Sequence, residues 1–157
     1  MAHRGTERVA QALAELAPDS AIRELDASTR TAAHAAAALG CPLGAIANSL
    51  IFMADTTPLL ILTSGDHRVD LDLVAASIGV DALRRATPEE VRAATGQPIG
   101  GVAPVGHPSP VRTLVDESLA RYETIWAAAG TPHAVFATTY GRLLSMTGGQ
   151  PVVVSDP

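Results

Sequence analysis

The chain has 157 residues, of which 47% are hydrophobic but only 3% aromatic, so we expect one domain with a core of alanine, valine, leucine and isoleucine. A net charge of −5 is unfavourable for general binding along DNA, and a single cysteine, Cys41, excludes an intramolecular disulfide and a multi-cysteine zinc site. All basic residues are arginine, which excludes lysine-based catalysis. We find no transmembrane run or signal-peptide pattern and expect a soluble, cytoplasmic protein without a membrane partner.

The first half of the chain combines helical spacing of apolar residues with short apolar runs typical of strands. In chain order, these patterns predict a helix over residues 7–16, a strand over 21–25, a helix over 29–39, and strands over 45–53 and 58–63. Asp26 or Ser28 is the expected N-cap of the second helix, which Gly40 ends. The last two strands form a predicted β-hairpin with a loop of four or five residues.

Two polar residues, Asn48 and Ser49, interrupt the first strand of this hairpin. Polar side chains inside a buried strand need hydrogen-bond partners. The two side chains therefore either contact each other or face a cavity.

The second half of the chain carries clear helix-capping signals. Asp70 is the expected cap of one helix, and Thr87 with Glu90 forms a capping box at the start of the next. In chain order, we predict helices over residues 71–78 and 88–95, a strand over 111–115, a helical turn over 116–119, strands over 124–128 and 133–138, a helical turn over 142–146, and an extended segment over 151–154. Helices and hairpins do not alternate strictly, so we predict an α+β domain with a mixed or mainly antiparallel sheet.

A loop over residues 99–110 contains three glycines and three prolines and follows the second of these helices directly. Glycine lets another group approach the backbone closely, and proline makes the loop stiff. Such a loop suits recognition of a ligand by backbone N–H groups, but its composition also fits a long turn. We call it the glycine loop.

The usual catalytic patterns are missing from this sequence. The five histidines show neither the i, i+4 pairing nor the clustering with cysteine that metal sites have, so we expect no metal and no cofactor. There is no Gly-x-Ser-x-Gly elbow. The adjacent carboxylates Glu89/Glu90 and Asp116/Glu117 are typical of helix N-termini rather than of a catalytic dyad.

The ordered motifs between residues 31 and 147 resemble those of the YbaK/prolyl-tRNA-editing family, whose members remove wrongly attached amino acids from tRNA. The matching segments are Thr31-Ala32-Ala33, Leu39-Gly40, residues 46–52, Ser64-Gly65-Asp66, Thr95-Gly96, residues 100–106, residues 115–119 and Ala128-Ala129-Gly130. No single segment is specific, but their order and spacing are.

The resemblance implies a single YbaK-like domain over residues 1–157, with a barrel-like sheet flanked by helices and a pocket for the aminoacylated 3′ end of a tRNA. It implies a deacylase in translation fidelity that acts in trans, with the substrate's own ribose hydroxyl activating the water. Backbone N–H groups of the glycine loop would stabilise the oxyanion. By position, the catalytic residues would be Asn48, Gly101, Val102 and Ala103, and the substrate-binding residues Thr31, Ser49, Gly65, Asp66, Gly100, Pro104, Gly106 and Asp116.

Asn48 stands where this family usually has a lysine. Asparagine donates a hydrogen bond but has no charge, so Arg68, Arg112 or Arg142 would have to supply a cation. A second interpretation follows, in which the domain is a catalytically weakened module that binds an aminoacyl-tRNA 3′ end or a small ligand. Asp116 is either a substrate ligand or the cap of the turn that it begins, and the sequence leaves the oligomeric state open.

Overall fold

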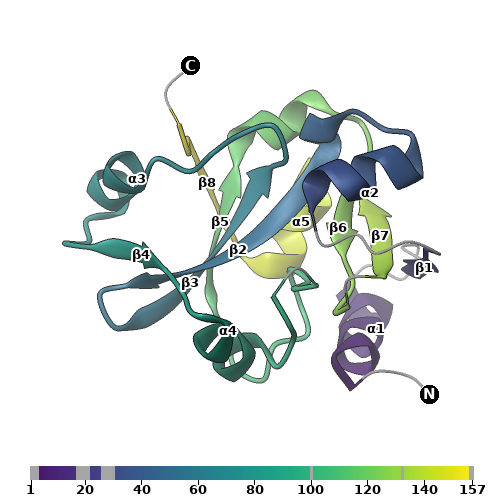
Figure 1. Ribbon diagram of the computed structural model, residues 1–157, viewed down its shortest axis with the longest axis horizontal. Coiled ribbons are helices and arrows are strands. Elements are labelled where there is room, and N and C mark those ends of the chain that lie inside the picture. Colours follow the sequence, from purple (N-terminus) through teal and green to yellow (C-terminus); the bar gives the residue numbers. More distant parts are fainter. Residues whose placement is uncertain (1–3, 17–21, 26–30, 100, 132, 156–157) are drawn as a thin grey trace.

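The computed structural model describes residues 4–16, 22–25, 31–99, 101–131 and 133–155 (Figure 1). They form a mixed sheet flanked by helices, which confirms the predicted α+β class. The helices are α1 (Arg4–Leu16), α2 (Ala32–Leu39), α3 (Leu71–Ile78), α4 (Pro88–Thr95) and α5 (Tyr140–Thr147), with 3-10 turns η1 (Leu43–Ala45) and η2 (Glu117–Arg121). The strands are β1 (Ile22–Glu24), β2 (Ile46–Ala54), β3 (Thr57–Ser64), β4 (Leu83–Arg85), β5 (Arg112–Asp116), β6 (Ile125–Ala128), β7 (Ala134–Thr138) and β8 (Gln150–Val152).

The sheet has the order β1-β7-β6-β2-β3-β5-β8, and β4 pairs with β2 outside this path. The pairs β1–β7, β6–β7, β2–β3 and β2–β4 are antiparallel. The pairs β2–β6, β3–β5 and β5–β8 are parallel. Parallel pairing is therefore nearly as frequent as antiparallel pairing in the described part of the sheet.

One edge of β2 is shared by two short strands and is open between them. At its start, Ile46 and Ala47 pair with β6, and at its end, Phe52 to Ala54 pair with β4. The register leaves residues 48–51 outside both ladders on this edge, although they pair with β3 on the other edge and the Ile51 carbonyl accepts the Ala86 N–H at 3.0 Å. An interrupted sheet edge exposes backbone donors and acceptors that a ligand can use.

Both faces of the sheet are covered, as the continuous apolar run of β3 indicates. Leu60 and Leu62 face a core formed with α1, α5 and the glycine loop. Leu59 and Ile61 face a second core against α3. All four side chains have no exposed surface, so β3 is a central, fully buried strand.

Two predicted boundaries were wrong. Helix α2 begins at Ala32 with Thr31 as its N-cap, whereas Asp26 and Ser28 lie outside the described residues. The β2–β3 hairpin has a two-residue turn, because Ala54 pairs with Thr57 and Asp55 takes a left-handed φ of 57°. Aspartate tolerates this conformation, so a loop of four or five residues is unnecessary.

Candidate functional site

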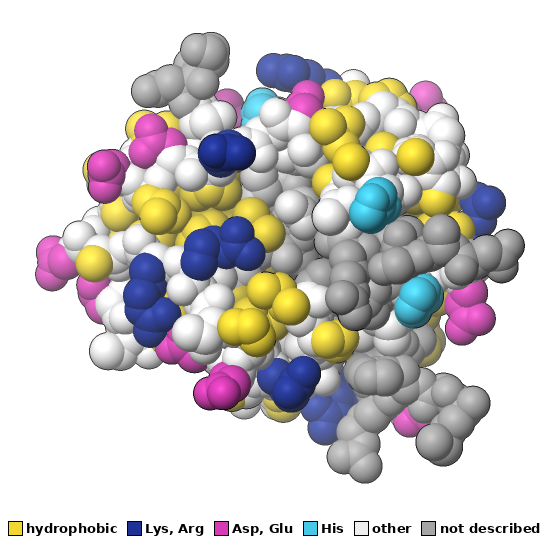
Figure 2. Space-filling model, viewed as in Figure 1, with side chains coloured by type: hydrophobic (Ala, Val, Ile, Leu, Met, Phe, Trp, Pro, Cys, Tyr) yellow, Lys and Arg dark blue, Asp and Glu magenta, His cyan; other side chains and the backbone are white. Residues whose placement is uncertain are grey.

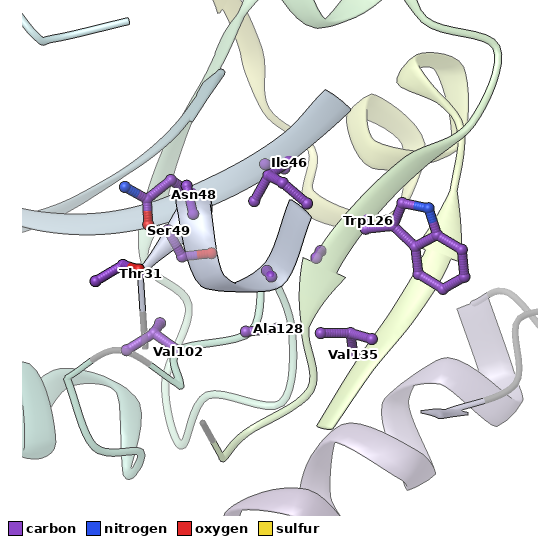
Figure 3. A pocket seen from close by; sticks show the side chains of 12 residues that line it. Thr31, Ile46, Asn48, Ser49, Val102, Trp126, Ala128 and Val135 are labelled. Carbon is purple, nitrogen blue, oxygen red and sulfur yellow. The ribbon is translucent and has the colours of Figure 1, made fainter. Parts of the chain in front are cut away.

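A cavity of about 340 Å³ lies along the open edge of β2. A chamber of about 30 Å³ adjoins it, and both share the lining residues Thr31, Ala32, Asn48, Ser49 and Val102. The chamber is otherwise lined mostly by small or apolar side chains of α2, β2, β6 and β7. Figure 3 shows the polar residues Asn48, Ser49 and Thr31 at one end, and Trp126 and Val135 at the other.

Asn48 and Ser49 both line the cavities, and their side chains form no hydrogen bond with each other. Both are partly buried on β2, and successive residues of a strand point to opposite faces. Ser49 Oγ is buried and has no hydrogen-bond partner among the described residues. Because a buried hydroxyl without a partner is costly, Ser49 is suited to bind a ligand at this position.

Thr31 fixes the first turn of α2 beside this pair. Its hydroxyl accepts the His34 N–H at 3.1 Å, and its carbonyl accepts the Ala35 N–H at 3.1 Å. Ala35 lines the chamber and is 4% exposed. The cap therefore positions the short side chains of α2 as one wall of the chamber.

The glycine loop contributes Val102 to both cavities, but two of its three expected amide donors are already bonded. Gly101 N–H donates to the Pro98 carbonyl at 3.0 Å, and Ala103 N–H donates to Gln97 Oε1 at 2.7 Å. Of the three expected amide donors, only Val102 N–H has no partner within the described residues. Val102 N–H is therefore the one of these three amides that can donate to a ligand without losing a bond to a described residue, and Gly100 lies outside the described residues.

The side chain of Gln97, which the sequence analysis did not single out, holds the loop in shape. It is 1% exposed, and Nε2 lies 3.3 Å from the Val105 carbonyl and 3.4 Å from that of Gly106. His107 Nε2 donates to the Ala103 carbonyl at 2.8 Å, and burial lowers the pKa of His107. A glutamine after a helix-ending glycine gives no pattern from which this role could be predicted.

Pro104 and Gly106 lie on the far side of the loop, beside α1, rather than at the cavity that contains Asn48. Gly106 has a φ of +84°, and a Cβ there would lie 2.9 Å from Val9 N and 3.0 Å from Val9 Cα. The absence of a side chain at Gly106 therefore permits close packing of the loop on α1.

Asp116 is 1% exposed and lies outside the lining of both cavities. Its carboxylate accepts the N–H groups of Ser64 at 3.0 Å and Ser118 at 2.9 Å, and it bonds His67 Nδ1 at 2.8 Å. Asp116 thus caps η2, which is one of the two roles that the sequence left open for it. It also ties η2 to the end of β3.

Gly65 and Asp66 belong to the same region and also lie outside the lining of both cavities. Gly65 N–H donates to the Ile46 carbonyl, and a Cβ at Gly65 would collide with the Leu43 carbonyl. Asp66 Oδ1 lies 2.8 Å from Ser64 Oγ. In this structure, Gly65 bonds the start of β2 and Asp66 bonds the end of β3, so both residues have a structural environment away from the cavities.

The cation at the cavity is Arg85, on a strand that the sequence did not predict. Arg68, Arg112 and Arg142, the arginines considered from the sequence, lie outside the lining of both cavities. Figure 2 shows arginine and hydrophobic side chains next to one another on this face of the molecule.

The described part of the chain has neither a cluster of metal ligands nor a membrane-spanning helix. It contains no group of three or more histidine, cysteine, aspartate or glutamate side chains that could hold a metal ion. None of its helices has the length and apolar character needed to cross a membrane. The polar side chains that line the larger cavity carry hydroxyl, amide and guanidinium groups.

Comparisons with known proteins agree with this architecture. A family model described as an aminoacyl-tRNA editing domain matches residues 26–146. A crystal structure titled "a putative trans-editing enzyme for prolyl tRNA synthetase" superimposes with a TM-score of 0.92 and 42% identity, covering all of both chains.

Relatives found by sequence similarity include a free-standing protein and a part of a proline–tRNA ligase. An uncharacterized protein, YwhH, of Bacillus subtilis is 33% identical over 119 residues, which is 75% of each chain. A proline–tRNA ligase of Nitratidesulfovibrio vulgaris is 34% identical over 114 residues, which is 73% of this chain but 18% of the ligase. The chain therefore matches only a part of that ligase.

Proposed function

The chain belongs to the aminoacyl-tRNA editing domain family, as its motifs predict, and on this basis we propose that it hydrolyses mischarged aminoacyl-tRNA in trans. The bond broken is the ester between the amino acid and the 3′-terminal ribose. The observation that carries the proposal is the cavity on the open edge of β2, which Asn48, Ser49 and Val102 line together, the Val102 N–H having no partner among the described residues. The likeness to a trans-editing enzyme over the whole chain supports action in trans.

The chemistry requires a donor for the carbonyl oxygen rather than a charged catalyst. Water attacks the ester carbonyl carbon, the C–O bond to the ribose breaks, and the ribose oxygen takes up a proton from the attacking water. A second hydroxyl of the ribose orients that water. Val102 N–H donates to the carbonyl oxygen as negative charge develops there, and a fixed amide needs no reorganisation during the reaction.

Asn48 and Ser49 orient the substrate in this proposal. The Asn48 side-chain amide offers donors and an acceptor to the ribose hydroxyls or to the amino group. Ser49 Oγ gains a hydrogen-bond partner, which it lacks among the described residues. Both contacts orient the ester for attack, which is how positioning residues accelerate a reaction.

The size of the chamber favours a small amino acid. About 30 Å³ between Ala35, Ala47, Ala127 and Val135 accommodates a group of roughly the size of one water molecule or a methyl group. Larger side chains would have to displace buried walls, which is unfavourable in a close-packed interior.

The test is hydrolysis of a panel of mischarged prolyl, alanyl and threonyl tRNAs, with buffer and heat-inactivated protein as controls. We expect release of the amino acid above both controls for at least one small amino acid. Flat time courses across the panel would contradict the proposal. Correctly charged tRNAs in the same assay measure selectivity.

One observation favours a second function, a binding module without catalysis. Asn48 is uncharged, whereas the family usually has lysine at this position, and Arg85 is the only cation that lines the cavity within the described residues. In that case, the protein binds the acylated 3′ end and the panel stays unhydrolysed. Binding and turnover must therefore be measured separately.

A further inference from the structure

Arg85 is the only charged residue among the described residues that line the larger cavity. The remaining lining consists of aliphatic side chains and the polar residues Thr31, Asn48 and Ser49. The chain has no lysine and no histidine among the described residues lines this cavity, so Arg85 is the lining side chain that can pair with an anionic ligand. Arg85 is exposed, so it reaches the ligand from the mouth of the cavity.

The backbone and one aromatic ring hold Arg85 in place. It lies opposite Phe52 in the β2–β4 ladder, and its guanidinium carbon lies 5.6 Å from the centre of the Phe52 ring. Phe52 is 1% exposed, which makes it a fixed platform. A guanidinium that lies over an aromatic ring keeps its N–H donors free for other partners, because these donors lie in the plane of the guanidinium itself.

The neighbouring arginine is used differently. Arg84 forms a two-pronged ion pair with Glu90, with both N···O distances at 2.8 Å. Arg85 makes no ion pair or side-chain hydrogen bond with any described residue. Two adjacent arginines thus differ in one respect, since one is neutralised by a carboxylate and the other is available at the cavity.

We propose that Arg85 binds a backbone phosphate in the single-stranded 3′ end of the tRNA and thereby places the terminal ribose beside Asn48. This rests on the proposed function, because it assumes that the cavity receives that ribose. The phosphate nearest the terminal ribose lies outside the cavity when the ribose is inside, where an exposed guanidinium meets it. Arginine pairs with phosphate through two parallel hydrogen bonds, so the contact fixes direction as well as charge. Arg85 is a positioning residue, and the chemistry remains with Val102 and the substrate.

The experiment compares Arg85→Gln, Arg85→Lys and the matched control Arg84→Gln. The probe is a fluorescent CCA trinucleotide with alanine joined to the terminal ribose by an amide, which cannot be hydrolysed as an ester. Its affinity is measured at several salt concentrations. A lost contact to single-stranded nucleic acid lowers the slope of log K against log salt by about 0.7.

We expect Arg85→Gln to weaken binding about tenfold and to reduce this slope by about 0.7, whereas Arg84→Gln leaves the slope unchanged. Arg85→Lys should keep the slope, because it keeps the charge. Chemical denaturation of all three variants reports any change in folding. An unchanged slope for Arg85→Gln, an equal change for Arg84→Gln, or no binding of the probe by the native protein would overturn the proposal. Displacement of the probe by millimolar inorganic phosphate would also overturn it, because the site would then bind a free anion.

Turnover separates this proposal from the proposed function. If the native protein hydrolyses mischarged tRNA, Arg85→Gln should raise KM and leave kcat nearly unchanged, since a phosphate contact binds ground state and transition state alike. A fall in kcat without a change in KM would contradict a positioning role. If the native protein binds the probe without turnover, the deacylase proposal fails, and the salt slopes still decide on Arg85.

Discussion

The side-chain carbonyl of Gln97 accepts the backbone N–H of Ala103 at 2.7 Å, and both groups are buried. The bond joins the end of α4 to the middle of the glycine loop. Together with the bond from Gly101 N–H to the Pro98 carbonyl, it leaves Val102 N–H as the one of the three expected donors that has no partner among the described residues. Gln97 therefore occupies one of the three expected donors and holds the loop around the Val102 amide.

Gln97→Met should remove the hydrogen bonds that hold the glycine loop, with little change in side-chain volume. The variant leaves the Ala103 N–H and the Val105 and Gly106 carbonyls without this partner in a buried place. We expect a loss of about 2–3 kcal/mol in the free energy of unfolding, measured with urea, and a lower kcat for deacylation. Unchanged stability together with native kcat would show that the loop keeps its shape without Gln97.

Gly106→Ala should destabilise the protein more than Gly79→Ala does. Both glycines have a left-handed φ, +84° and +74°, but a Cβ at Gly106 would contact the Val9 backbone, whereas one at Gly79 meets nothing within 4 Å. Gly79→Ala should therefore cost only the conformational term of about 1–2 kcal/mol. The difference between the two free energies of unfolding measures the packing of the loop on α1, and equal values would refute that close approach.

Glu90 makes a testable contribution to acid stability. Its hydrogen bonds with Arg84 and with the Thr87 N–H lower the pKa of Glu90 to about 2. Because this folded-state pKa is below the unfolded value of about 4.3, the ionised carboxylate stabilises the fold above pH 4.3. That stabilisation is lost as the pH falls from about 4.3 toward 2.

The measurement is the free energy of unfolding of the native protein and of Glu90→Gln between pH 3 and pH 7. The native protein should be the more stable one at neutral pH, and the difference should shrink below pH 4.3. Salt should reduce it, because the pair is partly exposed. A difference that stays constant with pH would contradict the role of the ion pair.

Local signals in the sequence predicted most elements of the fold. The capping box of Thr87 and Glu90 and the caps at Asp70 and Gly79 lie where expected, because short-range hydrogen bonds determine them. Strand β4 was missed, since its three residues Leu83–Arg85 are polar apart from one leucine and become a strand only by pairing with β2. A strand that depends on a tertiary partner leaves no periodic pattern.

Only a part of the candidate site was predicted, because the rest of it also depends on tertiary contacts. Asn48 and Ser49 were noticed because polar residues are unusual in an apolar strand, and the structure places both at the cavity. Arg85 was missed together with its strand, and Gln97 because its partners are backbone groups of a loop whose shape no local rule gives. Which amide of the glycine loop stays unbonded depends on these tertiary contacts.

Asn48→Lys distinguishes the two proposed functions. A deacylase that works without lysine should have native activity, which the added ammonium changes little, while Asn48→Ala lowers kcat/KM about five- to tenfold through the lost hydrogen bond. Hydrolysis is measured with the mischarged substrate on which the native protein is most active. Activity that appears only in Asn48→Lys would instead favour the binding module.

Val135→Ala should widen the chamber and relax the selectivity for small amino acids. Val135 lines the chamber and is 3% exposed, so truncation removes buried methyl groups from the wall next to Ala128. One methylene in such a pocket changes discrimination by about 10–200-fold. We therefore expect the ratio of kcat/KM for α-aminobutyryl-tRNA over alanyl-tRNA to rise at least about tenfold.

The control is Val115→Ala, which removes the same groups from a fully buried residue that lines neither cavity. Both variants should lose about 2 kcal/mol of stability. Only Val135→Ala should change the ratio, and an equal ratio in both variants would place the amino acid outside the chamber.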